Sequence, residues 1–210
     1  MKKKLTLIIA IIAILVMPVL VNAEEKENEA FKFRGFEWGT PLEEIKAKEI
    51  TDGMIEGFNY EYRETENAFI LMTTVANVNL FAWFFFDDDL KLNYGFYTPY
   101  TTLIKTDIEY YSDYETIDNA LIKLYGEPER FATGVDVDDI ADMNKDEIIS
   151  KVVQENAVIV HRWVANDGSE IYSNCCFLGG HVRGEFYYVQ SEDQFQELVA
   201  LDEASYTDGL

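Results

Sequence analysis

Alternation of apolar and polar side chains in two stretches of the chain predicts β-strands. In the first stretch we expect strands at residues 31–38, 58–62, 69–75, 79–86 and 90–96, with a hairpin turn at 87–89. In the second stretch we expect strands at residues 157–165, 170–178 and 182–190. Turns rich in glycine, asparagine and aspartate separate neighbouring strands, so the strands form a mainly antiparallel sheet.

A different spacing, of three and four residues, predicts a long helix at residues 106–125. One face of this helix would carry Tyr110, Tyr114, Ile117, Leu121 and Leu124. Gly126 and Pro128 are expected to end it, because glycine suits a helix C-terminus and proline prevents continuation.

Two further helices are predicted from their start signals. Thr40 and Pro41 begin a short helix that runs to about residue 49, and Ser191 with Gln194 begins a final helix. Residues 136–155 are acidic and are expected to form an inserted helix with an exposed acidic face. The predicted fold class is therefore α+β, a mainly antiparallel sheet with about three helices packed on it. The order of elements is compatible with two helix-plus-strands repeats.

The predicted strand at residues 79–86 has apolar side chains on both faces. An antiparallel sheet covered by helices on one face only would leave part of its other face to a partner, to the 136–155 insertion or to a second subunit. Exposed aromatic side chains more often mark partner sites than catalytic ones. Trp83 or Phe84 is therefore the expected centre of a binding surface, depending on which face the helices cover.

The N-terminus has the three parts of an export signal: Lys2 to Lys4, then a mainly apolar run to Val21, then small residues ending at Ala23. We expect cleavage after Ala23, a disordered lead-in at residues 24–30 and one α+β domain at residues 31–210. The expected location is extracellular or within the cell-envelope space, with no membrane attachment after cleavage.

The net negative charge of the chain excludes some classes of binding partner. The chain has 39 acidic and 17 basic residues, for a net charge of −22. Such a chain repels phosphate backbones and anionic membrane surfaces, so nucleic-acid binding is not expected. No cofactor and no resident metal are expected, although weak calcium binding by residues 87–89 or 136–142 stays open. We expect a monomer or a weak dimer.

Reactive side chains are few. Cys175 and Cys176 are adjacent, and a disulfide between them would be strained, so we expect two thiols on opposite faces of a strand, with a redox-active bridge as the alternative. Cys175 with His161 is conceivable as a thiol nucleophile and base, but a cysteine within a strand has no evident activation. Motifs of serine hydrolases, zinc proteases and phosphate-binding loops do not occur in the sequence.

Two segments of the sequence resemble segments of known protein families. Residues 33–45 (FRGFEWGTPLEEI) and 124–128 (LYGEP) resemble uncharacterised secreted proteins of Gram-positive gut bacteria. The segments and the helix-then-strands order also resemble the β-lactamase-inhibitor-protein-like fold and the small outer-membrane assembly lipoproteins. This resemblance implies a non-catalytic interaction module. The chain differs from these families in lacking a lipidation cysteine after the apolar run and the paired disulfides of the inhibitors.

These observations lead to one main functional hypothesis, an exported non-catalytic module that binds a protein or a cell-envelope ligand. The alternative is a secreted hydrolase that uses carboxylates and acts on cell-wall glycan. Acidic pairs are so common in this chain that no catalytic pair can be identified from the sequence.

Overall fold

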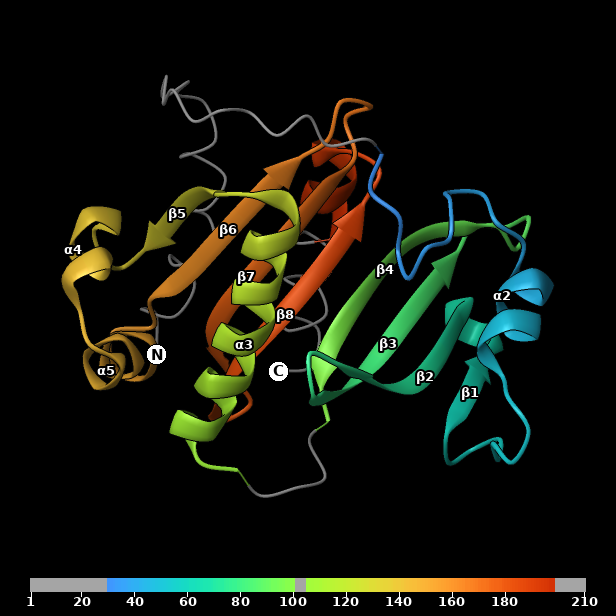
Figure 1. The fold of residues 1–210 in the computed structure, drawn as a ribbon, viewed down its shortest axis with the longest axis horizontal. Coiled ribbons are helices and arrows are strands. Elements are labelled where there is room, and N and C mark those ends of the chain that lie inside the picture. Colours follow the sequence, from blue (N-terminus) through green and yellow to red (C-terminus); the bar gives the residue numbers. More distant parts are fainter. Residues whose placement is uncertain (1–29, 101–104, 199–210) are drawn as a thin grey trace.

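A computed structural model of the chain describes residues 30–100 and 105–198 (Figure 1). The expected signal peptide at residues 1–23 and all but Ala30 of the expected lead-in lie outside the described residues. The helices are α2 (Leu42–Glu49), the 3₁₀ helix η1 (Glu64–Glu66), α3 (Asp107–Tyr125), α4 (Val137–Asp142) and α5 (Lys145–Gln154). The strands are β1 (Tyr60–Arg63), β2 (Ala68–Val75), β3 (Val78–Phe86), β4 (Leu92–Pro99), β5 (Glu129–Thr133), β6 (Val158–Val164), β7 (Glu170–Leu178) and β8 (His181–Val189).

The strands form one antiparallel sheet in the order β1-β2-β3-β4-β8-β7-β6-β5. Each half is a meander of neighbouring strands, and the two halves meet where β4 pairs with β8 at the centre of the sheet. Figure 1 shows this division, with β1 to β4 in one half and β5 to β8 in the other. The prediction of an α+β protein with a mainly antiparallel sheet is confirmed.

The main core lies between the sheet and its helices. Tyr114, Ile117 and Leu121 of α3 are buried against the sheet, together with Ile148 and Val152 of α5. Close approach of α3 to β8 depends on Gly184, because a Cβ atom there would lie 2.8 Å from the Tyr114 side chain. The expected apolar face of the long helix is thus correct except for Leu124, which is exposed.

Residues 31–38 do not form the expected strand. Arg34 and Gly35 both have positive φ angles, of 54° and 81°, so the chain reverses and only one bridge joins Phe33 to Phe36. The reversal places the Phe33 ring on the helix-covered face of the sheet, over Gly95 of β4, where a Cβ atom would be 2.2 Å from the ring. Alternation alone could not reveal this, because it does not report the local backbone reversal.

The starts of the helices agree only in part with the prediction. Thr106 caps α3 in a reciprocal capping box with Glu109, and Gly126 ends this helix with a φ of 89°. The pKa of the Glu109 carboxyl is lowered by hydrogen bonds from Thr106, mainly from its backbone N–H and then from its hydroxyl. The expected cap of α2 is wrong, because Pro41 occupies the N-cap position and the Thr40 hydroxyl donates to the Glu37 carbonyl.

The expectation of about three helices is also wrong. Asp142 ends α4 and Asn144 caps α5, so the acidic insertion forms two helices in place of one. Strand β5 was not predicted, because its sequence between Pro128 and Gly134 is short and lacks regular alternation. A helical segment at residues 192–198 does follow Ser191, whose hydroxyl accepts the Gln194 N–H at 3.3 Å. Among the described residues, no helix is both long and apolar enough to span a membrane.

Candidate functional site

The two faces of β3 differ in what covers them. Phe84 points toward the helices, is fully buried and packs against Phe33 and Phe69. Trp83 points to the opposite face and is half-buried. The helices therefore cover the Phe84 face, and Trp83 is the one of the two predicted binding residues that lies on the other face.

Aromatic side chains continue from Trp83 across the sheet. Register places Trp83 of β3 opposite Phe96 of β4, and Phe96 opposite Tyr187 of β8. Their ring centroids are 5.7 Å and 5.2 Å apart, with angles of 7° and 20° between the planes. Beside this row, Phe85 and Tyr94 stack with centroids 4.5 Å apart and planes 6° apart. We call these five residues the aromatic ladder.

An arginine lies at the β1 end of the aromatic ladder. The Arg63 guanidinium is centred 5.0 Å from the ring of Trp83, a cation–π contact. Glu61 and Glu66 hold the guanidinium through ion pairs of 3.1 Å and 3.5 Å. The contact fixes the Trp83 ring from one side, while Phe96 supports it from the other.

The C-terminal helical segment covers the opposite end of this face. Phe195 stacks on Tyr172 of β7 with centroids 3.6 Å apart, and its ring also meets Tyr187 at 5.7 Å. Phe195, Tyr172, Val160 and Val189 form a second, smaller hydrophobic cluster, separate from the main core. The segment therefore covers the β6–β8 part of the face, and the ladder residues of β3 and β4 are half-buried beside it.

A group of ion pairs around Arg162 attaches the C-terminal helical segment to the sheet. Arg162 of β6 pairs with Glu170, which is only 3% exposed, and with Glu192 of the helical segment at 3.1 Å. The Tyr172 hydroxyl donates to the same Glu170 carboxylate. Burial raises the pKa of Tyr172, and the Glu170 carboxylate adds to this effect. Burial alone would lower the pKa of Arg162, but the hydrogen bond to Glu170 and the nearby carboxylates raise it.

A polar cluster lies beneath α3, on the helix-covered face. The buried Asp118 carboxylate accepts hydrogen bonds from His161 Nδ1 at 2.9 Å and from the Ser173 hydroxyl at 2.7 Å. These three residue types also make up serine-hydrolase triads, but here serine and histidine both bond to the aspartate, whereas a nucleophilic serine needs a bond to histidine. The cluster therefore ties α3 to β6 and β7.

The adjacent cysteines lie on opposite faces of β7, as predicted for a strand. Both are thiols, Cys175 fully buried and Cys176 partly exposed. Burial raises the pKa of the Cys175 thiol well above its ordinary value, and the neighbouring Cys176 and Asp118 act in the same direction. Burial therefore makes Cys175 a poor nucleophile, and the hydrogen bonds of His161 Nδ1 go to Asp118.

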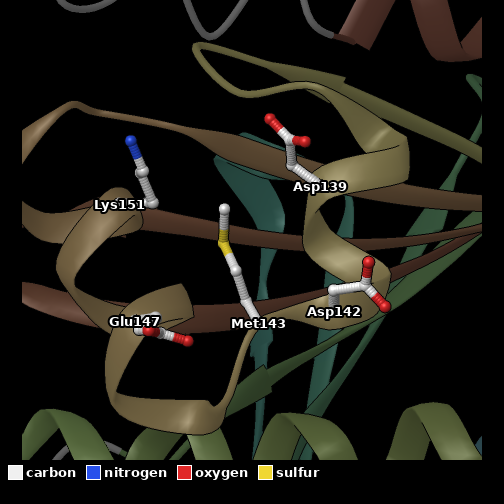
Figure 2. Close-up of a pocket in the computed structure, with 5 residues that line it drawn as sticks. All are labelled: Asp139, Asp142, Met143, Glu147 and Lys151. Carbon is white, nitrogen blue, oxygen red and sulfur yellow. The ribbon is translucent and has the colours of Figure 1, made fainter.

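Figure 2 shows a hollow between α4 and α5, with Met143 standing between the two helices. Asp139 and Asp142 of α4 and Glu147 and Lys151 of α5 complete its lining. Glu147 is already engaged, since its carboxylate accepts the Asn144 N–H at 2.8 Å in the α5 cap.

Two residues of the acidic segments stabilise local structure. Asp87 accepts two backbone N–H groups in the β3–β4 turn, and Asp136 caps α4. Within residues 30–100 and 105–198, no three histidine, cysteine or carboxylate side chains are grouped so that they could hold a metal ion.

Comparisons with protein-family models, curated proteins and solved structures found no match to this chain. The site must therefore be judged by its own geometry. Sequence reasoning identified Trp83 but not its ladder partners Phe96 and Tyr187, because cross-strand register decides which rings meet. The alternation of aromatic residues in the expected strands at 90–96 and 182–190 was the signal available.

Proposed function

We propose that this chain is an exported, non-catalytic binding protein whose protein or cell-envelope ligand docks on the aromatic ladder and contacts Trp83. One observation supports this most directly. Five aromatic side chains with parallel or nearly parallel stacked contacts lie on the sheet face opposite α3 and α5.

The physical properties of the ladder suit binding. Tryptophan and tyrosine are the residue types that most often dominate binding free energy, because each buries a large area with few rotatable bonds. The rings already support one another, and Arg63 holds Trp83 from the side. Little side-chain freedom is then lost when a ligand docks, which favours affinity.

The arrangement of elements supports the same proposal. Helix α2 precedes β1 to β4, and α3 precedes β5 to β8, with α4 and α5 inserted after β5. We interpret this order as two helix-plus-strands repeats, as in the β-lactamase-inhibitor-protein-like fold that residues 33–45 resemble. The resemblance implies binding through a surface, without catalysis.

Photo-crosslinking tests the proposed surface with a ligand whose identity is not yet established. A benzophenone amino acid replaces Phe85 in one variant and the exposed Leu124 of α3 in a control, and both proteins are produced in the native cell. We expect a crosslinked product from position 85 that disappears when Trp83→Ala is added, and none from position 124. Circular dichroism of the Trp83→Ala protein checks that it is folded. Equal products from both positions, or none from position 85, would contradict the proposal.

Export is part of the proposal and is tested separately. Because small residues end the apolar run at Ala23, the mature protein should begin at Glu24. Mass spectrometry of protein recovered from the culture medium or cell envelope would give this N-terminus. An intact Met1 on that protein, or its presence in membranes alone, would contradict export by cleavage.

A further inference from the structure

The turn before β1 has a feature that the aromatic ladder does not explain. Phe58 is 68% exposed and Ile55 is 64% exposed, the highest values among the large hydrophobic side chains of the described residues. Single exposed apolar side chains are common on protein surfaces. These two lie three residues apart in one turn, at the β1 edge of the sheet, so they form a local apolar tip.

Hydrogen bonds fix this apolar tip. The Asn59 side chain accepts the Ile55 N–H at 2.9 Å, and the Asn59 N–H donates to the Ile55 carbonyl at 2.8 Å. Gly57 donates to the Tyr60 carbonyl at 2.7 Å, which joins the turn to β1. Met54, just before the tip, packs against the main core. Because the backbone is held in this way, the two apolar side chains are presented outward without the cost of ordering a loose loop.

Acidic residues are frequent in the sequence on both sides of the tip. Residues 51–66 contain five acids and a single base, Arg63, which is itself paired with Glu61 and Glu66. The five acids are exposed; they are Asp52, Glu56, Glu61, Glu64 and Glu66. An anionic membrane surface is a poor partner for this region, because like charges repel. An apolar centre with a charged rim is typical of protein–protein interfaces.

We propose that Ile55 and Phe58 insert into an apolar pocket of a protein partner and that lysine or arginine residues border this pocket. This second surface uses none of the five rings of the aromatic ladder. The apolar pair supplies affinity through burial, and the acidic rim selects a basic partner and accelerates association.

A cationic peptide provides a direct probe. A synthetic amphipathic peptide of lysine and leucine is titrated onto the purified full-length protein at physiological salt, and fluorescence anisotropy gives Kd. A peptide with glutamate in place of lysine is the charge control. We expect Phe58→Ser and Ile55→Ser each to weaken binding of the lysine peptide about tenfold, as for a central interface residue. Higher salt should weaken it as well, and the glutamate peptide should not bind.

Matched variants distinguish this site from general attraction to an acidic protein. Ile108→Ser and Leu124→Ser remove other exposed apolar side chains, both from α3, and should change Kd less than twofold. Glu56→Gln should weaken binding more than Asp138→Asn in α4. Equal effects of all four apolar substitutions would overturn the proposal. So would an equal loss with Trp83→Ala, which assigns binding to the ladder, or Phe58-dependent binding to neutral phosphatidylcholine vesicles.

Discussion

The ring of Phe195 lies flat on the ring of Tyr172, with 3.6 Å between the centroids and 7° between the planes. The two residues are twenty-three positions apart in the sequence, and the contact joins the C-terminal helical segment to β7. The contact holds this segment over the β6–β8 part of the sheet face opposite α3, beside the ladder residues of β3 and β4.

Phe195→Ala should destabilise this attachment. Truncating a buried phenylalanine costs about 3–5 kcal/mol where the surroundings cannot collapse. We expect urea denaturation to show a loss of about 3 kcal/mol, and amide exchange in residues 192–198 to become much faster. Glu197→Ala, on the exposed side of the same segment, serves as the control and should be nearly neutral. Unchanged exchange in the Phe195→Ala protein would show that the stacking does not hold the segment.

Two leucines of α3 provide a matched pair for core packing. Leu121 is 5% exposed, whereas Leu124, one turn later, is 59% exposed. Leu121→Ala should lower the free energy of unfolding by about 2–5 kcal/mol, because it leaves a cavity against the sheet. Leu124→Ala should change it by less than about 0.5 kcal/mol. Similar effects in denaturant titrations would mean that α3 packs with a different face.

The cysteines should differ strongly in reactivity. Burial raises the pKa of the Cys175 thiol and excludes reagents from it, while Cys176 is partly exposed. In native protein near pH 8, iodoacetamide should modify Cys176 and leave Cys175 unmodified until denaturant is added, as read by peptide mass spectrometry. A native mass about two daltons below that of the reduced protein would instead establish a bridge between them.

Alkaline pH should unfold the protein through its buried tyrosines. Burial raises the pKa of Tyr97 to about 12, although Arg34 acts in the opposite direction, and burial raises the pKa values of Tyr114 and Tyr188 well above the ordinary value. The folded state thus holds these phenol protons more tightly than the unfolded state does. Their contribution to stability is complete below about pH 10 and is lost as the pH rises toward 12.

Tyrosinate absorbance near 295 nm checks this behaviour. The buried tyrosines should ionise above pH 10, together with loss of the circular dichroism signal. In denaturant, where all tyrosines are exposed, the absorbance should instead rise near pH 10. A single transition near pH 10 in the native protein would contradict burial of these rings.

Local sequence was enough to predict most elements. Helix α3 was predictable because its capping residue Thr106, its glycine end at Gly126 and its periodic apolar face all agree. Strands β2 and β3 were predictable because their residues are rich in apolar β-formers, and β7 because turn residues bound it on both sides. The fold class and the presence of an apolar second face on β3 follow from the same patterns.

Tertiary structure alone decided what those patterns mean for a site. Phe84 and Trp83 look equivalent in the sequence, but Phe84 is buried against Phe33 and Phe36 on the helix-covered face, whereas Trp83 lies on the other face. The aromatic ladder depends on the pairing of β4 with β8, which joins residues about ninety positions apart. Contacts between distant parts of the chain depend on the packing of the whole sheet. Local sequence propensity therefore does not predict them.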